Sequence, residues 1–229
     1  MTEVTVNISN YIEHTLLKPE ATKKQLTQLF DEAMEHNFLG VCINPAHVAF
    51  AKEYLKNSNV KIVTVIGFPL GANLSSVKAF ETQEAVNDGA DEIDMVINIG
   101  SLKNQDYQTV ENDIKAVVDA AMGHPVKVIL ETDLLTKDEI AEASKICVEA
   151  GAKFVKTSTG FVNGGVGAKA EDIKLMHKTV TPFGLQVKAS GGVRDSKKAL
   201  EMIEAGATRI GTSSGIQILK GLVDENTGY

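Results

Sequence analysis

The sequence predicts a (β/α)8 barrel, a TIM barrel built as a single domain over residues 1–229. Three observations lead to this fold. Short β-branched runs alternate with longer stretches of helical spacing, eight such units fit into 229 residues, and a Gly-Ala pair recurs between units. Units of about 28 residues suit a compact barrel and are too numerous for most open sheets. A doubly wound open sheet is the alternative fold.

Eight runs are expected to form strands. The first, YIEHTLL from Tyr11, gives the weakest signal and precedes Pro19 and a helix-like stretch that begins near Ala21. Seven clearer runs follow: FLGVCI from Phe38, KIVTVIG from Lys61, EIDMVIN from Glu92, VKVILE from Val126, KFVKTS from Lys153, LQVKAS from Leu185 and RIGTS from Arg209. Each precedes a longer helical stretch, which is the order of a βα unit.

Three junctions between a helix and the next strand carry the same pair, Gly89-Ala90, Gly151-Ala152 and Gly206-Ala207. A glycine directly after a helix commonly takes the left-handed conformation that ends it. Because a strand begins one to three residues later in each case, the pairs indicate one βα unit repeated along the chain.

Composition limits the partners. The 43% hydrophobic and 23% charged residues are average globular values. A net charge of -7 argues against nucleic acid or an anionic membrane, because these partners are bound by clustered Lys and Arg. The start lacks the regions of a signal peptide, and no apolar run is long enough to span a membrane. Cys42 and Cys147 lack CxxC spacing, so we expect a reducing, cytoplasmic location.

Alternate residues of a barrel strand point into the lumen, and the residues between them pack on the helices. With the apolar residues facing outward, this parity sends Asp94, Lys127, Lys156 and Lys188 inward. Charges in a lumen are costly to desolvate unless they are paired or used in chemistry. We expect Asp94 and Glu131 to be the partners of the lysines. A lumen ion-pair network without chemistry is the alternative.

Lys156 and Lys188 fall on consecutive strands, which favours chemistry over a purely structural network. Like charges brought close together destabilise each other's protonated forms. Only a neutral amine attacks a carbonyl, and a neighbouring ammonium together with burial favours that form. The pattern therefore predicts a lysine nucleophile that forms a Schiff base.

The last two βα loops of this fold commonly bind phosphate. Here they read SGGVR from Ser190 and GTSSG from Gly211. Glycines let backbone N–H groups approach phosphate oxygens, and serine hydroxyls and a helix N-terminus add to the site. Tight turns and helix caps are the alternative interpretation. Thr159 and Gly160, just beyond Lys156, are candidates for the rim of the same site.

Other chemistries lack their motifs. The five histidines are scattered, with no HxH or HExxH pair, so a zinc-dependent aldolase or hydrolase is disfavoured and no metal is expected. No GxGxxG follows a strand and no GxxxxGK[ST] occurs, so no nucleotide cofactor is expected. Cys42 has inward parity and is most simply a small buried hydrophobe.

Almost the whole chain resembles the deoxyribose-phosphate aldolases, a family of class I aldolases. The motifs that carry the resemblance are IEHTLLKP from Ile12, CINP from Cys42, VIGFPLG from Val65, ADEIDMVIN from Ala90, KVILET from Lys127, FVKTSTGF from Phe154, VKASGGVR from Val187, GTSSG from Gly211 and the last residue, Tyr229. The resemblance implies reversible cleavage of 2-deoxy-D-ribose 5-phosphate into acetaldehyde and D-glyceraldehyde 3-phosphate. It also implies a small phosphorylated sugar as partner, a homodimer, and no metal or organic cofactor.

The resemblance assigns roles to single positions. Lys156 is the Schiff-base nucleophile, Lys188 promotes the neutral form of its amine, and Asp94 takes part in proton transfer. Tyr229 is implied to reach the site and to assist proton exchange. The implied phosphate-binding residues are Gly191, Gly192, Gly211, Ser213 and Ser214.

Two positions depart from the family pattern. Glu13 stands where the family usually has Asp, so hydroxyl contacts near the first strand are expected to differ. Phe161 stands where some members have Lys, so one phosphate partner is absent. Two other functions fit the same residues: a Schiff-base aldolase or transaldolase with a larger donor, and a barrel that binds a phosphosugar without turnover.

Overall fold

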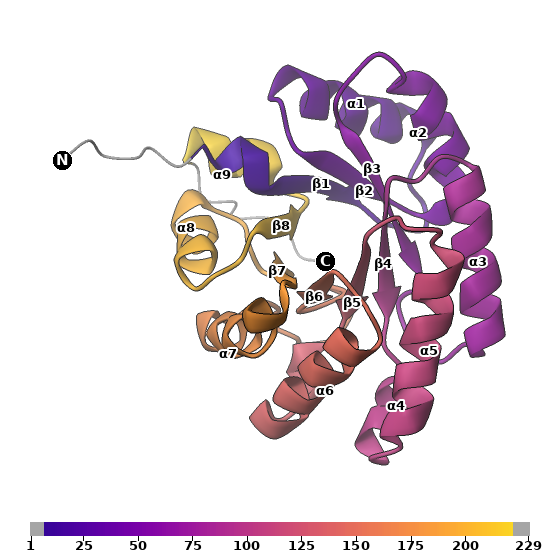
Figure 1. Ribbon diagram of the computed structural model, residues 1–229. Coiled ribbons are helices and arrows are strands. Elements are labelled where there is room, and N and C mark those ends of the chain that lie inside the picture. Colours follow the sequence, from indigo (N-terminus) through magenta and orange to yellow (C-terminus); the bar gives the residue numbers. More distant parts are fainter. Residues whose placement is uncertain (1–6, 222–229) are drawn as a thin grey trace.

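The computed structural model describes residues 7–221, which form a closed barrel of parallel strands surrounded by helices (Figure 1). The strands pair in sequence order, and β8 pairs with β1 to close the barrel. Their bounds are β1 Ile12–Leu16, β2 Gly40–Ile43, β3 Lys61–Ile66, β4 Glu92–Val96, β5 Val126–Ile129, β6 Phe154–Lys156, β7 Gln186–Ser190 and β8 Arg209–Thr212. The predicted (β/α)8 barrel is therefore confirmed, including its weakest strand.

Helices form the outer layer, and β4 is followed by two of them, α4 and α5. The helices are α1 Lys23–Glu35, α2 Val48–Tyr54, α3 Ser75–Asn87, α4 Ile99–Lys103, α5 Tyr107–Ala120, α6 Lys137–Glu149, α7 Ala170–Val180, α8 Ser196–Glu204 and α9 Gly215–Lys220. Single 3-10 turns occupy Ile8–Tyr11, Pro45–His47, Thr132–Leu134 and Thr181–Phe183. Within residues 7–221, no helix combines the length and apolar character needed to cross a membrane.

Capping boxes fix the starts of two helices. Before α1, the Thr22 hydroxyl accepts from the N–H of Gln25 at 3.4 Å, and the Gln25 side chain accepts from the N–H of Thr22 at 2.9 Å. Thr136 and Glu139 make the same pair of contacts before α6. Each box satisfies backbone donors that a helix N-terminus leaves without partners.

The Gly-Ala junctions take the conformation that the sequence indicates. Gly89, Gly151 and Gly206 have φ values of 107°, 81° and 113°. The strands β4, β6 and β8 each begin three residues later. A Cβ at Gly206 would lie 2.5 Å from the His177 ring, so this junction needs glycine for space as well as for φ.

Strand parity separates the main core from the lumen. Ile93, Val155 and Val187 are buried in the layer between strands and helices. Residues of the opposite parity point inward. Among them, Cys42 belongs to a small separate cluster with Leu17, Val63 and Val65, against which Phe68 packs. The lumen therefore has an apolar side near β2 and β3, and Asp94, Lys127, Lys156 and Lys188 lie at inward positions of β4 to β7.

Candidate active site

The strand register brings the four predicted lumen residues together. Lys156 of β6 pairs in register with Lys188 of β7, and Asp94 of β4 pairs with Lys127 of β5. All four are buried, and Lys156 has the largest exposed fraction, 3%. The lumen placement predicted from parity is what the structure has.

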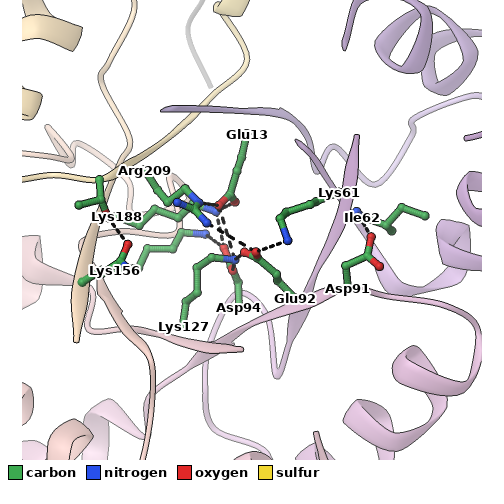
Figure 2. A network of polar contacts seen from close by, with 12 residues as sticks. Glu13, Lys61, Ile62, Asp91, Glu92, Asp94, Lys127, Lys156, Lys188 and Arg209 are labelled. Atoms are coloured by element: carbon green, nitrogen blue, oxygen red, sulfur yellow. Dashed lines mark hydrogen bonds and ion pairs between the residues drawn. The ribbon is translucent and has the colours of Figure 1, made fainter. Parts of the chain in front are cut away.

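Asp94 lies at the centre of a network of ion pairs (Figure 2). Its Oδ2 accepts from Lys156 Nζ at 2.7 Å and from Lys188 Nζ at 2.6 Å, and its Oδ1 accepts from Lys127 Nζ at 2.9 Å. Burial alone would raise the pKa of Asp94, but the charges of the three lysines hold it well below its usual range. Asp94 is therefore ionised and holds the three amines close to one point.

Glu13 and Glu92 add two more carboxylates to the network. Glu13 of β1 is fully buried and accepts a hydrogen bond from Lys188 Nζ. Lys127 Nζ lies 2.6 Å from Glu92 Oε2 and 3.5 Å from Glu13 Oε1. Glu13, which stands where the family usually has Asp, is therefore a carboxylate that binds a lysine in the lumen.

Two lysines of the network stay protonated. Burial alone would lower the pKa of Lys188, but Asp94 and Glu13 raise it. The same carboxylates raise the pKa of Lys127 against the effect of its burial. Both side chains therefore act as fixed cations beside Lys156.

Glu131 takes a partner that the sequence did not indicate. It lies just past β5 with φ 60° and ψ 62°, a left-handed conformation. Its carboxylate accepts from the N–H of Thr159 at 3.1 Å and from the Thr159 hydroxyl, and burial raises the pKa of Glu131. The expectation that Glu131 pairs with a lumen lysine is therefore wrong. The donors of Thr159, expected at the phosphate rim, are occupied by this carboxylate.

Lys156 lines a cavity of about 290 Å³ at the carboxyl ends of the strands, here called the lysine cavity. The predicted phosphate residues in its wall are Thr159, Gly191, Gly211 and Ser213. The hydroxyls of Ser158 and Ser190 also line it, and both are buried with no hydrogen-bond partner among residues 7–221. A buried hydroxyl in this position can serve an oxygen of a bound ligand.

A second cavity of about 900 Å³, the loop cavity, shares Gly191 with the first and extends over the loop after β6. Gly160 and Gly192 line it together with the cations Lys18 and Arg194. Gly192 has φ 71°, and a Cβ there would lie 2.4 Å from the carbonyl oxygen of Val166. Only glycine fits this close approach of two loops.

The other predicted site residues do not all lie at the lysine cavity. Ser213 is exposed at the cavity, whereas Ser214 is buried at the N-cap of α9. Phe161 lines both cavities and packs edge-on against Phe68, with ring centroids 5.1 Å apart. Tyr229 lies outside the described residues. In the described part of the chain, no group of His, Cys, Asp and Glu could hold a metal ion.

The sequence did not indicate that Glu92 and Arg209 belong to the network, nor that Glu13 contacts its lysines. A parity signal for Glu92 and Arg209 exists, because Glu92 lies two residues before Asp94, and Arg209 lies two residues before Gly211, which lines the lysine cavity. Glu92 and Arg209 are the first residues of β4 and β8.

A closed parallel barrel with a buried lysine that lines a cavity at the strands' carboxyl ends is the arrangement of enzymes that act through a lysine amine. The chain belongs to the DeoC/LacD family of aldolases, whose family model matches residues 10–221. It is therefore an aldolase, as the motifs predict.

Relatives agree along almost the whole chain. A deoxyribose-phosphate aldolase of Macrococcus caseolyticus is 59% identical over 216 residues, which cover 94% of this chain and 97% of the relative. The solved structure of the aldolase QR15 matches with a TM-score of 0.89 and 42% identity, over 94% of this chain and 96% of its own. The deoxyribose phosphate aldolase of Aeropyrum pernix, described as tetrameric, matches with a TM-score of 0.86 and 32% identity, over 93% and 89%.

Proposed function

We propose that the chain is a deoxyribose-phosphate aldolase that cleaves 2-deoxy-D-ribose 5-phosphate reversibly into acetaldehyde and D-glyceraldehyde 3-phosphate. The observation that carries the proposal is that the amines of Lys156 and Lys188 share one oxygen of Asp94, at 2.7 and 2.6 Å. Two ammonium groups on one carboxylate oxygen repel each other. Since Lys188 keeps its proton, the repulsion is relieved when Lys156 gives up its own.

In the cleavage direction, the neutral Lys156 amine attacks the C1 aldehyde and forms a carbinolamine. Loss of water then gives an iminium, which serves as an electron sink. Removal of the proton from the C3 hydroxyl breaks the C2–C3 bond, and the electron pair of that bond moves into the iminium. Glyceraldehyde 3-phosphate leaves, and the enamine of acetaldehyde stays on Lys156 until it is protonated at C2 and hydrolysed.

Asp94 and Lys188 move the protons in this scheme. Asp94 touches the nitrogen that forms the Schiff base, so it can accept the proton that the nitrogen loses as the carbinolamine forms. Lys188 can donate to the hydroxyl that leaves as water. The C3 hydroxyl lies further along the substrate, and we assign its proton to Asp94 acting through a water molecule.

The phosphate group is assigned to the glycine loops at the mouth of the barrel. Gly191 belongs to both cavities, which supports a placement in which a substrate bound at Lys156 extends toward the loop cavity. Arg194 and Lys18 provide positive charge in the loop cavity. They would take the place of the lysine that some family members have where this chain has Phe161. Gly160, Gly192, Gly211, Ser213 and Ser214 remain proposed contacts, through backbone N–H groups or hydroxyls.

Reductive trapping tests the proposal. Acetaldehyde with cyanoborohydride should add one ethyl group to the protein, and peptide mass spectrometry should find it on Lys156, because an iminium is reducible and a paired ammonium is not. A barrel that only binds a phosphosugar would show no preferential label on the buried Lys156 over the exposed lysines. Turnover of the phosphorylated substrate should remain after dialysis against EDTA, because no metal takes part in the proposed steps.

Other parts of the assignment are also proposals. We assign residues 1–229 to one catalytic domain, place the protein in the cytoplasm, and give Tyr229 a role in proton exchange at the enamine carbon. A Tyr229→Phe variant should keep the trapping at Lys156 and exchange the methyl protons of acetaldehyde with deuterated water more slowly. Wild-type exchange in this variant would remove Tyr229 from the scheme.

We further propose a homodimer that forms through α3. The buried residues of this helix include Lys78 and Thr82, and Lys78 pairs with Asp113 of α5 at 2.6 Å. The apolar side chains Val77 and Phe80 point outward, 46% and 64% exposed, beside two leucines of the preceding loop, Leu70 and Leu74, each 73% exposed. Exposed apolar side chains on one helix and the loop before it favour association.

A further inference from the structure

Arg209 is the first residue of β8, at the amino end of that strand, and it is not among the residues that line the lysine cavity. Figure 2 shows it as a member of the polar network of the lumen. Its Nε is 3.5 Å from Glu13 Oε1, and its Nη2 is 3.6 Å from Glu92 Oε1. The guanidinium also lies over the Phe154 ring, 5.1 Å from the centroid, and its side chain is 16% exposed. Arg209 thus contacts the two carboxylates that the proposed reaction does not use.

The charges of the network do not balance. Its inner part holds the cations Lys127, Lys156, Lys188 and Arg209 but only the carboxylates Glu13, Glu92 and Asp94. Two groups at the ends add one charge of each sign: Lys61, 3.4 Å from Glu92, and Glu131, bound to Thr159. With or without this outer pair, the lumen holds one more cation than carboxylates.

Other titratable groups near Lys156 do not remove this excess. The Cys42 thiol on β2 is buried, and burial raises its pKa, so the thiol is neutral. On the wall of the lysine cavity, His14 is bound to Glu32 at 2.7 Å, and Lys18 is exposed. An unmatched charge is costly among side chains as buried as Asp94, Lys127 and Lys188, so the network favours loss of one proton.

The contacts indicate which cation loses its proton. A guanidinium does not deprotonate in proteins. Lys127 and Lys188 each contact at least two carboxylates. Lys156 has one carboxylate within ion-pair distance among residues 7–221, and it shares that oxygen with Lys188. Lys156 is therefore the cation of the network that the carboxylates match least.

We propose that Arg209 is a positioning residue that keeps Lys156 neutral by holding a permanent positive charge on Glu13 and Glu92. Without the guanidinium, those two carboxylates draw Lys188 and Lys127 away from Asp94, and Asp94 is left to stabilise a protonated Lys156. The inference rests on the proposed Schiff-base function of Lys156, and its test separates the two.

The test follows the rate of ethyl addition to Lys156, with acetaldehyde and cyanoborohydride, as a function of pH. Arg209→Met should move the acidic limb of this profile to a pH about one unit higher. At a pH below the limb, this shift corresponds to about a tenfold smaller fraction of neutral amine and a tenfold slower labelling. At high pH the variant should label at the wild-type rate. Glu92→Gln removes a negative charge and should move the limb in the opposite direction. Arg209→Lys keeps the charge and should leave the limb where the wild type has it.

Lys61→Met is the matched control. Lys61 is a cation on the same carboxylate, Glu92, but its side chain is 44% exposed, so water screens its charge and the limb should move far less than with Arg209→Met. A residue that merely supports the barrel would lose activity at every pH, without recovery at high pH.

Two results would overturn the inference. In the first, the acidic limb of Arg209→Met lies at the same pH as the limb of the wild type. In the second, the limbs of Arg209→Met and Glu92→Gln move in the same direction. If Arg209→Met does not fold, Glu92→Gln decides alone, because only the charge argument predicts a downward shift. Absence of any label on wild-type Lys156 would instead contradict the proposed function.

Discussion

Lys156 and Lys188 lie in register on neighbouring strands, and their amines meet at the same oxygen of Asp94, 2.7 and 2.6 Å away. No other pair of lysines within residues 7–221 shares a carboxylate oxygen among the ion pairs of the structure. One of the two is held protonated by a second carboxylate, Glu13. This asymmetry gives the two amines different roles.

Lys188→Leu should lower turnover near neutral pH by at least about a hundredfold and move the acidic limb of kcat/KM upward. The substitution removes the ammonium that opposes protonation of Lys156, so less neutral amine is present. The measurement is a pH profile of kcat/KM for the phosphorylated substrate. An unchanged profile would mean that the two amines do not interact. Lys188→Arg is the control: it keeps the positive charge and should shift the acidic limb less than Lys188→Leu does.

Asp94→Asn should have a free energy of unfolding about 3–5 kcal/mol lower than that of the wild type at pH 7, because three buried lysines lose their common carboxylate. The pKa of Asp94 is lowered on folding, so its contribution to stability is present above its unfolded pKa, near 4, and is lost as pH falls through the folded value. The stability difference between the two proteins should therefore shrink in acid. Urea unfolding at a series of pH values measures it, and a difference that grows in acid would contradict the assignment.

Ser213→Glu should raise KM for 2-deoxy-D-ribose 5-phosphate much more than KM for unphosphorylated deoxyribose. Ser213 is exposed in the wall of the lysine cavity, and a carboxylate there repels the phosphate dianion without disturbing a buried contact. Ser213→Ala is the control and should have a small effect on both substrates. Equal losses on both substrates would place the phosphate elsewhere. Gly192→Glu is a poorer test, because any side chain at Gly192 meets Val166.

Phe80→Glu should convert a dimer into a monomer if α3 forms the proposed interface. Phe80 is 64% exposed, so the substitution costs little in the isolated chain but places a charge in an apolar contact. Light scattering after gel filtration measures the mass, and thermal unfolding checks the fold. Tyr107→Glu, at an aromatic residue that is 38% exposed on α5, is the control and should leave the mass unchanged. A wild-type mass in Phe80→Glu would exclude this surface.

The sequence by itself determined the barrel and the inward direction of its lysines. Both depend on local periodicity: β-branched runs of period two, helical stretches between them, and Gly-Ala junctions with positive φ. Parity along a single strand decides that Lys156 and Lys188 face the lumen, and no long-range contact is needed for that conclusion.

Only the tertiary structure decided which carboxylate each lysine meets. Glu13 contacts Lys188, 175 positions away in the chain, because closure of the sheet pairs β1 with β8 and so places β1 only one strand away from β7. Glu131 has the inward parity of its strand but turns to Thr159, because its backbone leaves the β region just after β5. Parity specifies the side of a strand, whereas the choice among several carboxylates depends on distances across the lumen, which are set only when the barrel closes.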